Sequence, residues 1–517
     1  MCPFHPCDSQ GIGPLRKGET FFWGMLVSWK GPIKAHAAWV VSVIALTSCA
    51  PSGKVAGPDI RVPDTFEVSV PSSEHDALRS DGRWWDAFRD DQLSALIEEA
   101  QKRAPDARTA LARLNEAYAI RSFALAAYNP QGALTAQGAD QHTTTHYSGV
   151  NLAGLGSGSG SSLASLFLPA DETKSYQGGF TSSWEVDLFG RRKAARRTAR
   201  ADLLAARFDF EASRLALEAN VATSLFQARA LAVQLEDARE QARISSELAR
   251  IGARKTELGL ASGADQDRLD ADAASSASEL VRLTALATAA RRSLLVLIGR
   301  GTDATSSLPI TAVLGDPPPS PAVTPSEVLF RRPDVREAEQ RLRSAIGTLT
   351  LDRLALLPTL TLSPGASWSH SEANFISKTS VWTIAASASA PVLDRPRLIG
   401  VARLQRAKAE EASVVYEQAI LNAYRDAENG LNQLEADRTR LDQLRIAETK
   451  ARRAFDSSRK AYDQGLLDLT TLLDAERSWR GARSALTALK ASALIDAVTT
   501  VKALGGGWSG RPPKVKG

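Results

Sequence analysis

Two long runs of sequence, 191–258 and 401–464, contain no proline and only one glycine each, Gly252 and Gly430. At a rise of 1.5 Å per residue, a helix of roughly 65 residues is about 100 Å long. Uninterrupted helices of this length are typical of coiled coils and not of compact domains. Hydrophobic residues spaced alternately three and four apart support this assignment: Leu280, Leu283, Ala287, Ala290, Leu294 and Leu297. We therefore expect helical rods.

The chain carries one design twice. Pro105 is followed 25 residues later by Pro130, and Pro333 is followed 25 residues later by Pro358. The motifs around Pro105 and Pro333 are alike, Lys-Arg-Ala-Pro-Asp and Phe-Arg-Arg-Pro-Asp, and a Gly-Leu pair recurs 206 residues apart, at 259–260 and 465–466. Such self-similarity indicates repeated structural units. We expect repeats at 89–300 and 325–504, a linker at 301–324 and a C-terminal tail at 505–517.

After Pro130 and Pro358 the helical period gives way to alternation. In 176–188 the even positions are largely apolar, including Phe180 and Trp184, and the odd positions are polar or glycine. Segments 359–369 and 381–390 alternate similarly, and 134–141 more weakly. A half-buried soluble sheet alternates in the same way, but the lengths also suit tilted transmembrane strands. Since a bilayer tolerates no open sheet edge, four strands in a membrane require several chains.

The N-terminal region has the pattern of an export signal. From Met25 onward, Lys30 and Lys34 precede the apolar run 37–46, and Leu-Thr-Ser-Cys ends at Cys49. This resembles a signal peptide with a lipobox, which predicts an acylated Cys49 as the first mature residue; an ordinary leader followed by a chance cysteine is the alternative. We expect a leader at 1–48, in which 1–24 precede the true start, and a lipidated extension at 49–88. The covalent lipid is the only cofactor expected.

Specific motifs resemble those of one family. The segment 184–191, Trp-Glu-Val-Asp-Leu-Phe-Gly-Arg, is similar to a signature of the TolC-like outer membrane factors. The lipobox, Arg-Arg-Pro-Asp-Val-Arg at 331–336 and the ending Leu-Gly-Gly-Gly-Trp at 504–508 resemble the NodT-type lipoprotein branch, which serves RND efflux. The resemblance covers about residues 55–508. One departure is Pro-Val-Leu-Asp-Arg-Pro at 391–396, where the family has a glycine pair, so we expect a stiffer corner there.

The resemblance implies a mainly α fold with a β-barrel portion. A homotrimer would form a 12-stranded transmembrane β-barrel, with four strands per protomer, continuous with a long α-helical coiled-coil barrel. This barrel would dock onto a periplasmic adaptor (membrane fusion) protein and an inner-membrane pump.

The same resemblance suggests a periplasmic gate. Gly259 and Gly465 would form the tips of two helical hairpins, and Asp474 matches an acidic position that faces the lumen near the constriction. Three copies would form a carboxylate ring, which can select cations; the alternative is a solvated aspartate in the first turn of a helix. Arg268, at the same offset from its tip, could pair with Asp474. Asp468 and Asp265 are lesser candidates.

One dense basic cluster, 191–200, follows the second strand. Its residues Arg191, Arg192, Lys193, Arg196 and Arg197 are expected to face the headgroups of outer-membrane lipid, although an exposed helix start is an equal alternative. The formal net charge of +5 comes from interspersed charges, so we expect no nucleic-acid partner. His142 and His146 lack the glutamate of a zinc motif, and no catalytic set is evident, so neither a metal nor an enzymatic activity is expected.

These patterns predict an exported protein of the cell outer membrane that extends into the periplasm. Its predicted function is the passive exit duct of a tripartite efflux system for small molecules such as drugs. A duct for type I protein secretion and a lipid-anchored coiled-coil scaffold without a pore are the alternatives. The sequence does not identify the cargo.

Overall fold

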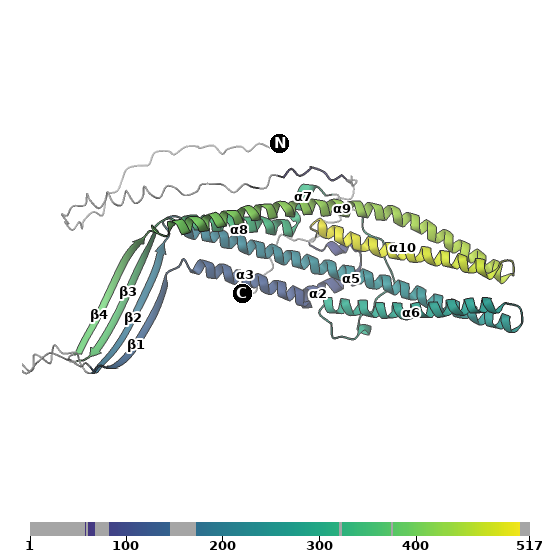
Figure 1. Cartoon of the computed structure of the whole chain (residues 1–517), viewed down its shortest axis with the longest axis horizontal. Coiled ribbons are helices and arrows are strands. Elements are labelled where there is room, and N and C mark those ends of the chain that lie inside the picture. The colour runs from purple at the N-terminus through teal and green to yellow at the C-terminus, as the bar shows by residue number, and fades with distance from the viewer. Residues whose placement is uncertain are drawn as a thin grey trace, which may run out of the picture. The chain divides into compact units, whose positions relative to one another are not determined.

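The structure is a computed structural model that describes Gly57 and residues 60–67, 82–144, 172–319, 323–373 and 376–506. The first repeat contains α2 (Asp91–Arg103), α3 (Pro105–Ala126), β1 (Gln131–His142), β2 (Glu172–Val186), α5 (Arg191–Glu257) and α6 (Gly263–Leu297). The second repeat contains α7 (Pro325–Arg331), α8 (Pro333–Leu354), β3 (Thr359–Glu372), β4 (Ile376–Ser389), α9 (Arg395–Asp463) and α10 (Leu469–Ala503). The same order of elements recurs, as the repeated motifs predict (Figure 1).

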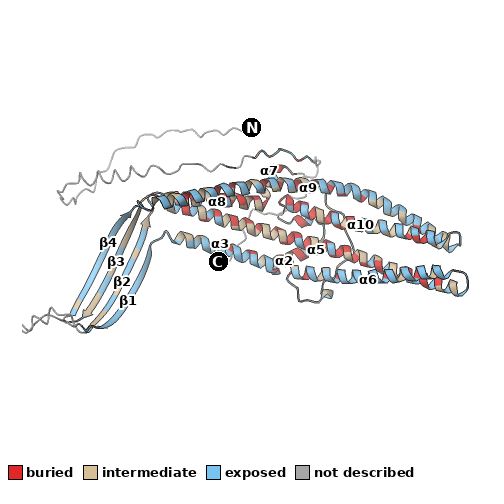
Figure 2. Ribbon diagram, in the orientation of Figure 1, coloured by how far each residue is buried: buried red, intermediate tan, exposed pale blue. Residues whose placement is uncertain are grey.

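The four strands form one antiparallel sheet in the order β1-β2-β3-β4. The register aligns the even residues of neighbouring strands: Phe180 lies opposite both Leu134 and Ala366, and Ala366 lies opposite Trp382. Leu134 and Trp382 are 85% and 86% exposed. The sheet therefore presents an apolar face to its surroundings, and Figure 2 shows β1 and β4 exposed along their length, with β2 mixed and β3 mostly intermediate. Within the described residues, β1 and β4 are edge strands without a further partner.

The long helices form a layer in which neighbours change along their length. α5 packs between α3 and α8 near the sheet, and between α6 and α10 farther away. α9 packs against α8 and then against α10. Near the sheet, α5 buries a series of alanines that permit close helix approach: Ala194, Ala195, Ala199, Ala201 and Ala205. The main core lies midway, where the 3₁₀ helix η2 (Trp84–Phe88) and α2 pack on α5 with Trp84, Ile97 and Phe226 buried.

A short N-terminal segment crosses the outside of this layer. Residues 60–67, called the strap below, pack against α9 and α8. Phe66 stacks on Tyr424 with ring centroids 5.7 Å apart, and the Glu67 backbone N–H donates to the Glu428 carboxylate. Ile60 and Val62 pack against a cluster that Tyr416 also contacts. The strap therefore marks one face of the helical layer.

The two corners between strand and helix differ as the sequence predicts. Gly190, with φ of 83°, precedes α5 and relaxes the first corner. The second corner has Asp394, Arg395 and Pro396 instead, with Pro396 in the first turn of α9 and an Asp394–Arg397 ion pair of 2.6 Å. This corner contains no residue with positive φ, so the chain turns there without the glycine conformation.

α10 is the single helix in the described ranges whose length and composition would suit a membrane crossing, with a mean hydropathy of 1.2 over its best window. Half of that window is buried against other parts of the protein. α10 packs on α9 and α5, which accounts for its apolar face, because a buried helix meets the same criterion.

Candidate functional site

The hairpin tips have the same backbone geometry. Gly259 and Gly465 both have φ of 73°. In the first tip, Gly259 N–H donates to the Thr256 carbonyl and Leu260 N–H to the Lys255 carbonyl; equivalent bonds recur around Gly465. These are the paired bonds of a Schellman motif, which ends a helix with a left-handed residue. The Gly-Leu repeat thus encodes two equivalent turns.

The acidic residues next to the tips take part in helix capping, Asp468 as the cap itself and Asp265 as the partner of a capping serine. Asp468 is the N-cap of α10 and accepts a hydrogen bond from Thr471 N–H at 2.7 Å. Hydrogen bonds from Thr471 lower the pKa of Asp468. In the first hairpin Ser262 caps α6 by accepting from Asp265 N–H, and donates in turn to the Asp265 carboxylate at 2.7 Å. Both aspartates therefore have a structural role in setting the tip.

Asp474 lies in the second turn of α10 and its side chain is 68% exposed. Its carboxylate pairs with Arg477 at 3.4 Å. Arg268 is exposed on α6. The contact expected between Asp474 and Arg268 is therefore not made within one chain, because Asp474 pairs along its own helix.

A different pair connects the two hairpins. Lys255 donates to the Tyr462 hydroxyl at 3.2 Å, and its ammonium lies 4.8 Å from the Tyr462 ring centroid. The two residues belong to the last turns of α5 and α9. Farther from the tips, Arg483 of α10 pairs with Asp237 of α5 at 2.5 Å. Neither contact was predicted from the sequence, although the position of Lys255 and Tyr462 just before the two tip glycines was an available signal.

A buried polar cluster lies between the hairpins. Glu476 of α10 is 1% exposed, and the Gln241 side chain of α5 is one of its polar neighbours. The Arg480 guanidinium lies 3.5 Å from the Glu476 carboxylate and 4.0 Å from the carboxylate of Asp272 on α6. Asp272 in turn accepts from Ser245 of α5 at 2.7 Å. Burial raises the pKa of Glu476, and the Arg480 guanidinium opposes that rise. The interface between hairpins is therefore polar and sensitive to protonation.

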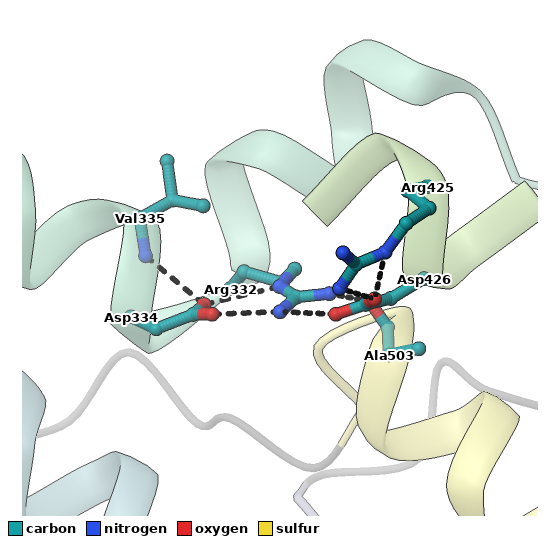
Figure 3. A network of polar contacts seen from close by, with 6 residues as sticks. All are labelled: Arg332, Asp334, Val335, Arg425, Asp426 and Ala503. Atoms are coloured by element: carbon teal, nitrogen blue, oxygen red, sulfur yellow. Dashed lines mark hydrogen bonds and ion pairs between the residues drawn. The ribbon is translucent and has the colours of Figure 1, made fainter. Parts of the chain in front are cut away.

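The Arg-Pro-Asp motif of the second repeat, 332–334, joins two helix ends. Buried Arg332 donates to Asp334 at 2.6 Å, to the Ala503 carbonyl at 3.0 Å and to Asp426 at 3.4 Å. Figure 3 shows Arg332 between the start of α8, the middle of α9 and the end of α10. Gly505, with φ of 73°, comes just after α10 and packs closely on the backbone of Arg332. A Cβ at this position would lie 2.9 Å from the Arg332 backbone nitrogen. This network fixes the junction where α10 ends and α8 begins.

The basic cluster divides into two parts. Arg191 pairs with Glu185 at 2.8 Å. The Arg192 guanidinium donates to the Asn129 amide oxygen at 3.2 Å, and the Arg192 backbone N–H donates to Asp187 at the corner between β2 and α5. Lys193, Arg196 and Arg197 are exposed. Glu185 at the end of β2 was a signal that Arg191 has a protein partner.

Two expectations, on Cys49 and on the pair His142 and His146, lie wholly or partly outside the described residues. Cys49 and His146 fall there, whereas His142 ends β1. In the ranges that the structure describes, no three His, Cys, Asp or Glu residues are placed to hold a metal ion. The arrangement has the features of a conduit: a sheet with an apolar face, long helices and paired tips.

Comparison with known proteins gives a consistent result. The family model described as outer membrane efflux protein matches residues 96–300 and 324–506. OpmQ of Pseudomonas aeruginosa, a pyoverdine export outer membrane protein, is 31% identical over 428 residues, which cover 82% of this chain and 87% of OpmQ. CusC of Escherichia coli K12, a cation efflux system protein, is 26% identical over 474 residues, 90% of this chain and 97% of CusC.

Solved structures agree with the fold. The open state of the MtrE outer membrane channel from Neisseria gonorrhoeae aligns with a TM-score of 0.69 and 25% identity, over 89% of this chain and 98% of that chain. The resemblance to TolC-like factors, drawn from the motifs, is thereby confirmed. This chain belongs to the outer membrane efflux protein family, whose members are the outer-membrane channels of tripartite efflux pumps.

Proposed function

We propose that this efflux channel works as a homotrimer in which three copies of the four-stranded sheet close one transmembrane β-barrel of twelve strands. The main support for this proposal is the open sheet. β1 and β4 are edge strands, and the face formed by the even-numbered residues is apolar and exposed. An open edge in a bilayer leaves backbone groups without partners, and closure with other copies satisfies them. The family resemblance supplies the number three.

The helices would continue the barrel as a tunnel into the periplasm. There a periplasmic adaptor and an inner-membrane pump would dock, and the channel would conduct cargo passively as a non-enzymatic duct. The relatives are named for export of pyoverdine, of cations and of toluene, so one architecture accompanies different cargoes. We propose small molecules, such as drugs, as the cargo class here. These names favour small-molecule export over protein secretion, and the apolar sheet has no use in a scaffold without a pore.

The gate would lie at the hairpin tips. Gly259 and Gly465 form the turns, and Asp474 would contribute to a carboxylate ring in the trimer, with Asp468, Asp265 and Arg268 nearby. A ring of exposed carboxylates repels itself when it narrows and attracts cations. The exposure of Asp474 supports this proposal. The Lys255–Tyr462 contact would hold the hairpins of one protomer together when the gate is closed.

A lipid on Cys49 would anchor the chain to the outer membrane, and the exposed members of the basic cluster, Lys193, Arg196 and Arg197, would face the headgroups of its inner leaflet. Arg191 and Arg192 would instead stabilise the corner between strand and helix.

Conductance measurements on the purified protein test this function. We expect a detergent-stable trimer that forms ion-conducting pores in planar bilayers and prefers cations. Replacement Asp474→Asn should reduce cation selectivity, whereas Asp463→Asn, on the other side of the tip turn, serves as a charge-matched control. A monomer without conductance would contradict the proposal. Equal effects of the two substitutions would remove Asp474 from the gate.

A further inference from the structure

The helical surface next to the sheet carries arginines that no carboxylate neutralises. Arg196, Arg197 and Arg200 are exposed on α5 and make no ion pair within the described part of the chain. Arg191 and Arg192 differ, because they bind side chains at the corner. Unpaired arginines on one surface attract an anionic partner, since their charge is compensated only by solvent.

These arginines line two adjoining grooves. The groove between α5 and α8, of about 560 Å³, includes Arg197, Arg200 and Arg343 and has no acidic residue in its lining. The groove between α3 and α5, of about 370 Å³, has Arg200 in common with the first and adds Leu125 and Leu203. Because Arg200 and Leu204 line both grooves, the grooves lie on one face of α5. That face combines guanidinium groups with leucine side chains, which suits a ligand with an anionic end and an apolar chain.

The position of the grooves places them close to the membrane. α5 begins at Arg191 directly after the strand corner, so Arg197 and Arg200 lie about 9 and 14 Å along the helix from that corner. Helical side chains lean towards the N-terminus of their helix, which on α5 is the sheet end. An arginine can also lay its stem on apolar surface while its charged end extends towards headgroups.

The strap indicates which face is outward. Its residues Ile60 and Val62 pack, as Tyr416 does, against a cluster of Val335, Ile420 and Ala423 from α8 and α9, and Arg343 lies about two turns farther along α8. The chain before the strap leads back to Cys49. A lipid attached there enters the bilayer from outside the tunnel, so the face with the strap and Arg343 is the outer one. This step rests on the proposed acylation of Cys49.

We propose that the α5–α8 groove binds the phosphate of an anionic phospholipid from the inner leaflet of the outer membrane, with Arg197, Arg200 and Arg343 as its ligands. Guanidinium groups present paired N–H donors that match phosphate oxygens. Arg343 also pairs with Glu339 at 2.6 Å, which holds its stem beside the groove. The adjoining leucines of the α3–α5 groove accommodate part of an acyl chain.

Native mass spectrometry of the trimer, released from nanodiscs, tests this binding. One set of nanodiscs contains phosphatidylcholine alone and the other contains phosphatidylcholine with phosphatidylglycerol. We expect the wild-type trimer to retain phosphatidylglycerol in preference to phosphatidylcholine. The triple variant R197Q/R200Q/R343Q should lose that preference, by roughly fivefold for each arginine removed.

Two further variants separate a site from general charge. R438Q/R452Q/R453Q removes the same charge from exposed positions on α9 and should keep the lipid preference. R197K/R200K/R343K keeps the charge and should retain part of it. Equal loss in both glutamine variants, or no preference in the wild type, overturns the proposal. Failure of the groove variant to form trimers assigns the arginines to a subunit contact and also overturns it.

Conductance distinguishes this inference from the channel function. If the groove variant conducts normally while the wild type shows no lipid preference, only the lipid site is wrong. If the wild type forms neither trimers nor pores, the proposed function itself fails.

Discussion

The contact between Lys255 and Tyr462 offers the sharpest test of how the tips are held. Replacement Lys255→Met keeps most of the side-chain stem and removes the ammonium group. That group donates to the Tyr462 hydroxyl at 3.2 Å and lies 4.8 Å from the ring centroid. The substitution therefore removes a hydrogen bond and a cation–π contact between hairpins, and it leaves the apolar packing of the stem in place.

The magnitude follows from these two interactions. A hydrogen bond of this kind contributes about 1 kcal/mol net, and a partly exposed cation–π contact contributes about 0.5–1 kcal/mol. Together they contribute about 1–2 kcal/mol per protomer. If the contact exists only in the closed tip, its loss raises the open population of a protomer by a factor of about 5 to 30.

Single-channel recording in planar bilayers measures this shift. We expect Lys255→Met to increase the time spent in high-conductance states, and Tyr462→Phe, which keeps the ring, to produce roughly half of the free-energy change. The control is Arg254→Met, because Arg254 pairs within its own helix, with Glu257 at 2.9 Å. The double variant of Lys255 and Tyr462 should differ from the sum of the single effects, since the two residues are in contact.

Two results would refute this reasoning. If Lys255→Met behaves like Arg254→Met, the contact does not stabilise the closed tip. If Tyr462→Phe and Lys255→Met add without coupling, the two side chains do not act as a pair in the membrane.

Three further predictions concern stability, measured by thermal unfolding of the trimer in detergent. Burial raises the pKa of Glu476. Its carboxyl therefore destabilises the fold increasingly as pH rises from the unfolded pKa of 4.5 through the raised native pKa. Glu476→Gln should stabilise the trimer at neutral pH by on the order of 1 kcal/mol, and the stabilities of the two proteins should converge below a pH of about 4. Arg332→Met leaves two carboxylates and a carbonyl without their partner and should cost about 3–5 kcal/mol, whereas the surface control Arg341→Met should cost less than about 0.5 kcal/mol. Gly465→Ala introduces only left-handed strain, about 1 kcal/mol, because its Cβ would meet open space; Gly505→Ala adds a clash with the Arg332 backbone and should cost several times more.

The sequence predicted the long helices and the strands because their signals are local. Residues 191–258 lack proline and nearly lack glycine, and the structure places a helix at Arg191–Glu257. The second strand was expected at 176–188 and lies at Glu172–Val186, with its end fixed by the corner that contains Gly190. The weakest alternation, at 134–141, also became a strand, Gln131–His142. The hydrophobic periodicity and the positions of proline and glycine were sufficient to predict these elements.

Contacts between the hairpins could not be predicted in the same way. Asp474 and Arg268 occupy equivalent positions in the two repeats, nine residues after each tip glycine. Arg268 lies on α6 and Asp474 on α10, and both of these helices pack on α5. The observed partners, Lys255 and Tyr462, occupy positions that differ by one residue relative to their tips, and one residue rotates a helical side chain by about 100°. Helix rotation, which the sequence pattern leaves open, decided the pairing.

The partners of the basic cluster at 191–200 could not be predicted from the sequence for a different reason. Six cations in 191–200 look alike in sequence, yet the structure separates Arg191 and Arg192 from the rest. The separation comes from two groups at the corner, the Glu185 carboxylate and the Asn129 amide, which reach only the first turn of α5. Charge count alone does not reveal which cations already have a protein partner.

The distribution of small and polar residues along α5 has a mechanical consequence. Near the sheet, the alanine series brings helix backbones together with short side chains that have no rotamers to exchange. Towards the tips, the interface instead contains Ser245, Asp272 and Glu476, whose contacts can be exchanged for water. Elastic stiffness should therefore be high beside the membrane and fall towards the tips. In the proposed trimer, a force applied at the hairpin tips would bend and shear the last turns of the hairpins and leave the helices next to the sheet unchanged.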